Sequence, residues 1–292
     1  INMKRRDRFS PFLRIGSMKI NKYPDGASYV NNVGTEHQTF ALKSYEDLWH
    51  LAQYVDAFTS QHNFKPRITI SHLIDAQADR RFNKGESSGL KLVCKFLNSL
   101  DVKKYFVFHP HNAEVIEALL DNVQIIDNSQ FIKSVLFNKF GRTVNNHAPD
   151  NKLILMSSDA GGFKPLMKLC DSIKWEGETY SASKSRDHET HKLTQLVDRQ
   201  DFGGKDILIV DDLCVYGGTF KGLAKMLRER NCGKLYLAVS HMTVQDLGND
   251  PVTDYFDGVY TTNSKYDIYK AKEGYCGELN VLKTFYYDVI SK

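Results

Sequence analysis

The sequence predicts an α/β protein of two domains, each built on a mainly parallel sheet flanked by helices. Its 292 residues correspond to two domains of about 150 residues each. The composition, with 41% hydrophobic and 25% charged residues, is that of a globular protein and excludes a largely disordered chain. Strand and helix patterns alternate in both halves, which favours parallel sheets with helices on their faces.

The first half begins with a helix pattern. Ser44 and Asp47 have the spacing of a capping box, and apolar residues follow at helical spacing. The elements predicted after this helix are a strand at 67–74, a helix over 90–100, a strand at 105–108 and a short helix ending near residue 120. The polar stretch 75–87 is long for a connection of about 2–6 residues, and ligand sites tend to lie in such loops after parallel strands.

The second half repeats this scheme, which indicates a duplicated architecture. Apolar periodicity is lost over 136–152, so we expect one domain over 1–140 and another over 141–292. An alternative is that the last residues of the second domain pack back on the first. The elements predicted in the second domain are strands at 152–156, 206–210 and 234–240, a helix over 165–173, a hairpin of 179–183 with 193–197 around a tip at 184–192, and a helix to residue 231 with Gly233 as its C-terminal cap.

Charge and cysteine content narrow the classes of partner. Lys and Arg total 39 against 35 Asp and Glu, so the formal charge of +4 is too small for a protein that coats nucleic acid but permits a small anionic ligand. No apolar run reaches the roughly 18 residues of a membrane span, so no membrane partner is expected. The five cysteines lack a CxxC spacing and are typical of reduced thiols in a cytoplasmic protein.

The most informative segment follows a buried apolar strand. It brings two adjacent carboxylates, Asp211 and Asp212, to the carboxyl edge of the predicted sheet. Gly217 and Gly218 allow a tight turn, and Thr219 opens the next helix, so free N–H groups and the helix dipole favour an anion there. Paired carboxylates beside such a turn suit the two hydroxyls of a ribose. Spacing alone fits equally well an ordinary strand that ends in an Asp pair and a glycine turn.

This segment resembles the phosphoribosyl-diphosphate (PRPP) binding motif of type I phosphoribosyltransferases and of ribose-phosphate diphosphokinases, the PRPP synthetases. Further matches, in the same order and spacing from about residue 20 to 260, select the second family. They are 158–164 for its SPDAGGxKR segment, 184–186 for the KxR of its catalytic flexible loop, 79–81 for its RQDRR loop, 23–26 for FxDGE and His111 for the histidine of its DLHA-type segment.

The resemblance implies two phosphoribosyltransferase-like domains and a family reaction in which the β,γ-diphosphate of ATP passes to the anomeric 1-hydroxyl of ribose 5-phosphate, giving PRPP and AMP. It also implies Mg²⁺ and a homo-oligomer, either a dimer or a hexamer. The implied roles are catalysis for Lys184 and Arg186, acceptor ribose-phosphate binding for Asp211, Asp212, Tyr216, Gly217, Gly218 and Thr219, ATP binding for Asp25, Gln77, Asp79, Arg80 and His111, and metal binding for His111 and Asp159.

Three departures from the family pattern bear on the substrate. Residues 214–216 are Cys-Val-Tyr where the family has an acid and a small hydroxyl residue, 77–78 are Gln-Ala in place of Arg-Gln, and Ala27 replaces a glutamate. A larger ribose 5-phosphate ester such as ADP-ribose is therefore an alternative acceptor, with its adenosine half stacked on Tyr216. The first acceptor would place the protein in nucleotide biosynthesis and the second in NAD metabolism.

Other interpretations stay open. A phosphoribosyltransferase would use the same ribose loop, and a non-catalytic homologue would keep only the fold. Taken singly, Lys184 and Arg186 fit a solvated turn, Asp79 and Arg80 a surface ion pair, and His111 a fragment of a zinc site that no Cys or carboxylate set completes. The chain has no GxxxxGK[ST] motif, which excludes a P-loop as the ATP site.

Overall fold

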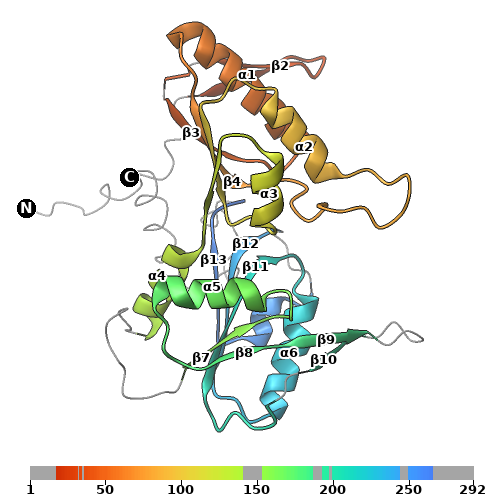
Figure 1. Cartoon of the computed structure of the whole chain (residues 1–292), viewed down its shortest axis with the longest axis vertical. Coiled ribbons are helices and arrows are strands. Elements are labelled where there is room, and N and C mark those ends of the chain that lie inside the picture. Colours follow the sequence, from red (N-terminus) through yellow and green to blue (C-terminus); the bar gives the residue numbers. More distant parts are fainter. Residues whose placement is uncertain are drawn as a thin grey trace, which may run out of the picture. The chain divides into compact units, whose positions relative to one another are not determined.

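The computed structural model describes residues 18–31, 33–34, 36–140, 153–186, 193–196, 199–243 and 249–265 (Figure 1). The chain forms two compact units that divide between Asp127 and Asn128. The boundary predicted from the sequence lies one helix later, at 140/141. That helix, α4 (Ser129–Phe140), packs against α5 and β12 of the second unit, which is why the units divide before it. The suggested return of the last residues to the first domain lies outside the described residues.

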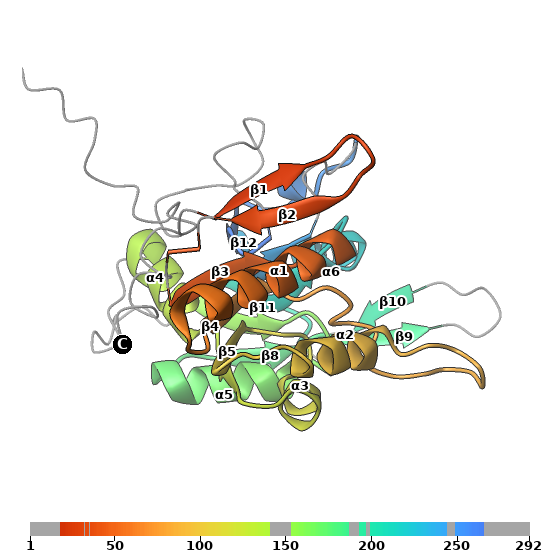
Figure 2. The same ribbon diagram turned by 90° about the horizontal axis from the view of Figure 1, so that it is seen from above.

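The first unit is a four-stranded parallel sheet with connecting helices. The strand order is β3-β4-β5-β6, so each strand lies beside its predecessor in the chain. A two-stranded hairpin lies beside α1 (Figure 2). The bounds are β1 (Lys19–Lys22), β2 (Ser28–Asn31), β3 (His37–Ala41), α1 (Tyr45–His62), β4 (Arg67–His72), α2 (Gly89–Asn98), β5 (Lys104–Phe108), α3 (Ala113–Leu119) and β6 (Val123–Ile126).

The predicted capping box at the start of α1 is confirmed. The Asp47 amide donates to Ser44 Oγ over 3.3 Å, and the Ser44 amide donates to Asp47 Oδ2 over 2.8 Å. The helix ends at Asn63, whose φ of 57° closes it in the left-handed region. Its inward face, including the fully buried Leu51 and Tyr54, packs in the core with the sheet.

The second unit is a five-stranded parallel sheet in the order β13-β12-β11-β7-β8. Every residue of β7 and β12 is buried, as expected for strands covered on both faces. In the described part of the chain no helix is long and apolar enough to cross a membrane. The bounds are β7 (Leu153–Ser157), α5 (Phe163–Ile173), β8 (Thr179–Ser181), β9 (Ser183–Arg186), β10 (Leu193–Leu196), β11 (Asp206–Cys214), α6 (Gly218–Glu229), β12 (Leu235–Met242), a 3₁₀ turn η1 (Val252–Tyr255) and β13 (Gly258–Thr262).

The predicted fold class is confirmed, because both units are parallel sheets flanked by helices. The predicted hairpin is partly wrong. Residues 179–181 form β8 at the edge of the main sheet, and β9 pairs with β10 instead, with Lys184 opposite Gln195 and Arg186 opposite Leu193. Lys184 and Arg186 therefore lie in a strand and not at the tip; residues 187–192 are outside the described part.

Two smaller expectations also change. Strand β11 does not stop at Val210 but continues to Cys214, because β12 pairs with it that far, so Asp211 and Asp212 lie within the strand. Gly233 is not the cap of α6: Asn231 takes the positive φ, of 56°, after the helix. Gly233 instead permits a close approach, since a Cβ there would lie 2.4 Å from the Gly204 carbonyl oxygen.

Candidate active site

A glycine turn joins β11 to α6 at the place where an anion cradle is predicted. Gly217 is the N-cap of α6 with φ 76°, and a Cβ at this position would lie 2.5 Å from Val252 Cβ. Both facts require glycine. Gly218 begins the helix and faces open space, and the first turn carries no acidic residue. The turn therefore places backbone N–H groups at the positive end of a helix, which suits a phosphate.

Asp211 and Asp212 stand just before this turn, on β11. The Ser158 hydroxyl donates to Asp211 Oδ2, and the Asp212 amide donates to Asp211 Oδ1 over 2.8 Å. Burial, followed by the charge of Asp212, raises the pKa of the Asp211 carboxyl to about 7. Asp211 is therefore held in place by its neighbours and poised to bind a proton near neutral pH.

The loop after β7 reaches the same edge of the sheet, since β7 and β11 are neighbouring parallel strands. Asp159 Oδ1 accepts a hydrogen bond from the Gly162 amide over 2.9 Å, which closes the turn into α5. Hydroxyls of Ser157 and Ser181 donate to the Asp159 carbonyl over 2.9 and 3.1 Å. With the Ser158–Asp211 hydrogen bond, this loop brings the predicted metal ligand and the predicted ribose carboxylates to one place.

Strand β9, which carries Lys184 and Arg186, begins next to this loop. The Ala182 amide donates to the Ser157 carbonyl over 3.1 Å, so the entry to β9 is tied to the loop that carries Asp159. Beyond the backbone of β9, the positions of the Lys184 and Arg186 side chains lie outside what the structure describes. Their catalytic role stays a prediction.

The three residues at 214–216, which depart from the family pattern, differ in their exposure to solvent. Tyr216 is 61% exposed and Val215 38%, whereas Cys214 is buried at the end of β11. Burial raises the pKa of the Cys214 thiol to about 12, so this thiol is not a nucleophile at neutral pH. Tyr216 thus presents a ring beside the phosphate turn, as stacking on a second group of a substrate would need.

In the first unit, Asp79 pairs with Arg80 and is bound by the residue that follows His111. The Asn112 side-chain amide donates to Asp79 Oδ2 over 3.2 Å, and Asn112 directly follows His111. Arg80 Nε lies 3.4 Å from Asp79 Oδ1; the Asp79 side chain is 7% exposed and that of Arg80 69%. The Asp79 carboxylate is thus anchored by Asn112, and the Arg80 guanidinium faces solvent.

Asp25 and Gln77 are placed by turns and are exposed. Asp25 lies in the tight connection between β1 and β2, where its Oδ1 accepts from the Ala27 amide over 3.0 Å. Gln77 lies in the turn after β4. The ATP-binding roles of Asp25 and Gln77 stay predictions.

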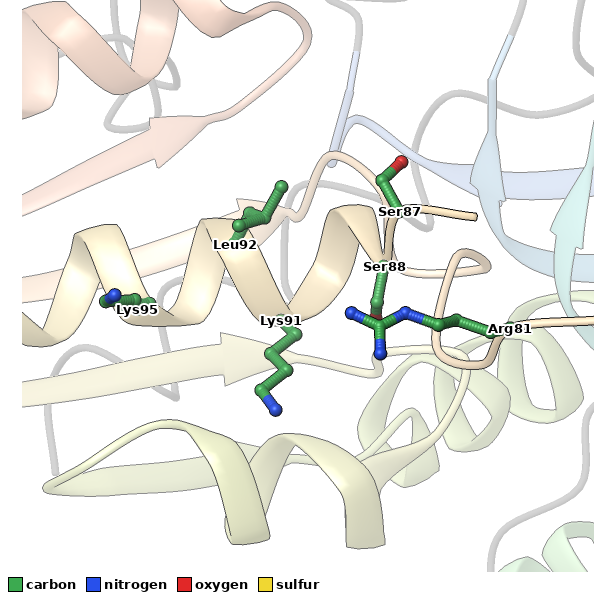
Figure 3. Close-up of a pocket in the computed structure, with 6 residues that line it drawn as sticks. All are labelled: Arg81, Ser87, Ser88, Lys91, Leu92 and Lys95. Atoms are coloured by element: carbon green, nitrogen blue, oxygen red, sulfur yellow. The ribbon is translucent and has the colours of Figure 1, made fainter. Parts of the chain in front are cut away.

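A pocket of about 290 Å³ adjoins the Asp79–Arg80 segment at the start of α2 (Figure 3). Figure 3 shows the Arg81 guanidinium extending toward Ser88. Three of the lining side chains are cations, although the surface that they present to the pocket is largely apolar. Sequence analysis did not identify this pocket, although the spacing of Lys91 and Lys95 on a predicted helix places both on one face. The lining residues are Arg81, Ser87, Ser88, Lys91, Leu92 and Lys95.

The arrangement of donor side chains decides which metal ion the protein is suited to bind. Within the described residues, no group of three or more His, Cys, Asp and Glu side chains is arranged to hold a metal ion alone. Mg²⁺ takes few protein ligands beside water and substrate phosphates. Asp159 is an oxygen donor of the kind that Mg²⁺ prefers; His111 lies in the other unit.

Comparison with known proteins bears on the family and the fold. A family model described as "Phosphoribosyl transferase domain" matches residues 122–268. The chain is 24% identical over 230 residues to a ribose-phosphate pyrophosphokinase of Pyrococcus abyssi, covering 77% of this chain and 76% of the relative. For the one of Pyrococcus furiosus the values are 23% over 255 residues and 86% of each chain. The crystal structure of phosphoribosylpyrophosphate synthetase from Mycobacterium smegmatis superposes with a TM-score of 0.69 at 17% identity, covering 88% of this chain and 83% of that one.

Proposed function

Because this chain is a distant member of the ribose-phosphate pyrophosphokinase (PRPP synthetase) family with a phosphoribosyl transferase domain, we propose that it transfers the β,γ-diphosphate of ATP to the anomeric 1-hydroxyl of ribose 5-phosphate. The products are PRPP and AMP. The observation that carries the proposal is the glycine turn at Gly217, which opens helix α6 a few residues after the Asp211–Asp212 pair.

The acceptor sugar binds in the second unit. Its 5-phosphate accepts hydrogen bonds from the N–H groups of Gly217, Gly218 and Thr219 at the start of α6. Asp212 and Asp211 accept hydrogen bonds from the ribose hydroxyls, which fixes the ring with its anomeric carbon turned toward the donor. Ser158 keeps the Asp211 carboxyl from turning away while the sugar binds.

ATP binds through residues of the first unit. Arg80, oriented by Asp79, pairs with phosphate oxygens, and His111, Gln77 and Asp25 contribute polar contacts as the family resemblance implies. The cationic pocket beside Arg81 adds positive charge near the same segment.

Phosphoryl-group transfer needs in-line positioning and charge neutralisation more than a protein nucleophile. The acceptor hydroxyl oxygen forms a bond to the β-phosphorus of ATP and releases its proton to water. The bond from that phosphorus to the α,β-bridging oxygen breaks, and AMP leaves with that oxygen. Lys184 and Arg186 stabilise the charge on the transferring group. Asp159 would hold Mg²⁺ together with substrate phosphates, and the ion would supply further neutralisation of that charge. The metal role of His111 stays an implication of the family resemblance.

The direct test is to incubate the protein with ATP, Mg²⁺ and ribose 5-phosphate and to quantify AMP and PRPP. We expect one AMP per PRPP, and loss of both in Lys184→Ala. Lys168→Ala, on the exposed side of α5, is the matched control and should keep full turnover. Absence of AMP release with every acceptor tested, or full activity of Lys184→Ala, would contradict the proposed reaction.

A second acceptor is favoured by one observation, the 61% exposure of Tyr216 beside the phosphate turn. We propose ADP-ribose as the alternative acceptor, with its adenosine half stacked on this ring while the ribose 5-phosphate half binds as above. AMP release from ATP with ADP-ribose is compared with that from ribose 5-phosphate, in the wild type and in Tyr216→Ala. Turnover of ribose 5-phosphate alone would exclude the larger acceptor.

The family resemblance also leads us to propose that the protein assembles as a homo-oligomer, a dimer or a hexamer. Light scattering on the purified protein measures the mass in solution. A monomer across the micromolar range would contradict this proposal.

A further inference from the structure

An ion-pair cluster joins the chain on either side of the β9–β10 hairpin. Glu178 lies just before β8, which leads into β9, and Arg199 lies just after β10. Arg199 Nη1 is 2.5 Å from Glu178 Oε2, and Lys205 Nζ donates to Glu178 Oε1. One carboxylate therefore holds two cations, and it does so across the base of the strand pair that carries Lys184 and Arg186.

Arg199 is fixed on several further sides. Its Nη1 donates to the Tyr180 hydroxyl over 2.8 Å and its Nε to the Asp201 carbonyl over 2.7 Å. The guanidinium lies over the rings of Tyr180 and Phe202, at 5.4 and 5.3 Å from their centres. Phe202 is completely buried. Such a planar, many-sided arrangement defines the position of Arg199 far better than a single surface ion pair would.

The same base is tied to the candidate active site. The Ser181 hydroxyl donates to the Asp159 carbonyl and the Ala182 amide to the Ser157 carbonyl, both over 3.1 Å. On the exit side β10 contacts α6, the helix that begins at the glycine turn (Figure 1). The hairpin is therefore held between the loop of Asp159 and the cluster of Glu178.

On the function proposed above, we propose that Glu178 is a positioning residue: by holding Arg199 and Lys205 it fixes the base of the β9–β10 hairpin and so sets where Lys184 and Arg186 stand during transfer. The side chains of Glu178, Arg199 and Lys205 are 30%, 26% and 25% exposed, so solvent screens the cluster only in part. Glu178 touches no reacting atom. Its effect on the reaction is transmitted through the hairpin, where misplacement of a charge-stabilising group by about 1 Å is enough to slow a transfer strongly.

The experiment combines amide hydrogen exchange with steady-state kinetics. Glu178→Gln keeps the size of the side chain and removes its charge, and Arg199→Lys keeps the charge and removes the fork. We expect exchange in 183–186 and 193–196 to be about tenfold faster in both variants. We also expect kcat to fall about tenfold, with the KM for ATP changed less than about twofold. Asp257→Asn, which breaks the 2.6 Å pair with Arg228 elsewhere in the unit, is the matched control and should do neither.

The outcomes separate this proposal from the proposed function. If the wild type turns over no acceptor, the reaction is wrong, while exchange still decides whether Glu178 holds the hairpin. Unchanged exchange in both variants overturns the proposal. Faster exchange with wild-type kcat overturns the positioning role, because the hairpin would then loosen without consequence for transfer.

Discussion

The hydroxyl of Ser158 donates a hydrogen bond to the carboxyl of Asp211, joining the ends of two neighbouring parallel strands. Ser158 follows β7 and Asp211 lies in β11, so the contact couples the loop that carries Asp159 to the carboxylate pair beside the phosphate turn. Any substrate held by the pair is thereby placed against the loop that the family resemblance assigns to Mg²⁺.

The first prediction concerns stability and pH. The folded protein raises the pKa of Asp211 from 3.8 to about 7, so the folded state binds this proton more tightly than the unfolded state. The stabilisation is complete below the unfolded pKa and is lost as the pH rises through about 7, a change of up to about 4 kcal/mol. Asp211→Asn should therefore gain stability relative to the wild type between pH 5 and 8.

Urea unfolding of both proteins at a series of pH values measures this difference. Asp171→Asn, on the exposed side of α5, controls for the loss of one negative charge from the same unit. A constant difference between Asp211→Asn and the wild type from pH 5 to 8 would mean that Asp211 does not titrate in this range.

The second prediction concerns the glycine turn. In Gly217→Ala a Cβ must occupy a left-handed backbone position and a space 2.5 Å from Val252 Cβ. We expect a loss of about 2–3 kcal/mol of unfolding free energy and a KM for the acceptor raised about tenfold or more. Gly218→Ala, one residue later in open space, is the matched control. Equal behaviour of the two variants in urea unfolding and in kinetics would show that the turn tolerates a side chain.

Local signals in the sequence were sufficient for the elements that depend on neighbouring residues. The capping box of Ser44 and Asp47 and the strand–turn–helix around Gly217 involve contacts within a few positions, so their pattern is visible in a short stretch of chain. The family resemblance then indicated which loop carries Asp159. The fold class followed because alternating strand and helix patterns leave few arrangements other than a parallel sheet.

The features that were missed depend on contacts between distant parts of the chain. The alternating pattern of 179–183 fits a hairpin strand as well as an edge strand, and only the pairing of β8 with β7 decides between them. A side chain is excluded at Gly233 because the Gly204 carbonyl oxygen occupies the space that it would need. The cationic pocket arises because the polar stretch 75–87 brings Arg81 back to α2, and a loop without periodicity gives no sign of its path.

The third prediction concerns the buried thiol at the end of β11. Since burial raises the pKa of Cys214 to about 12, almost none of it is thiolate at pH 8. In the folded protein, iodoacetamide should leave Cys214 unmodified while it labels the less buried Cys232. Peptide mass spectrometry measures both positions, and labelling in urea verifies that each can react. Labelling of Cys214 as fast as Cys232 in the native state would show that the β11 end opens to solvent.

The fourth prediction tests the nucleotide side through Asn112. Its side-chain amide donates to Asp79 Oδ2, and its carbonyl oxygen accepts from the Val115 amide at the start of α3, over 3.2 Å in each case. Asn112→Asp keeps the helix cap and replaces the donor to Asp79 with a second negative charge. Asp79 then loses its anchor and Arg80 its orientation. Loss of a hydrogen bond to a carboxylate costs about 1.5 kcal/mol, so we expect the KM for ATP to rise roughly tenfold.

Steady-state kinetics with ATP and the acceptor varied in turn check this result. The acceptor KM should not change, because the proposed sugar site, with Asp211 and the glycine turn, belongs to the other unit. Asn98→Asp is the matched control, since Asn98 makes comparable hydrogen bonds, to the Leu119 carbonyl and from the Asp121 amide, away from Asp79. An equal rise in both KM values would point to a general disturbance of the fold. Unchanged kinetics would remove Asp79 and Arg80 from the ATP site and leave them as the surface ion pair that their spacing alone suggests.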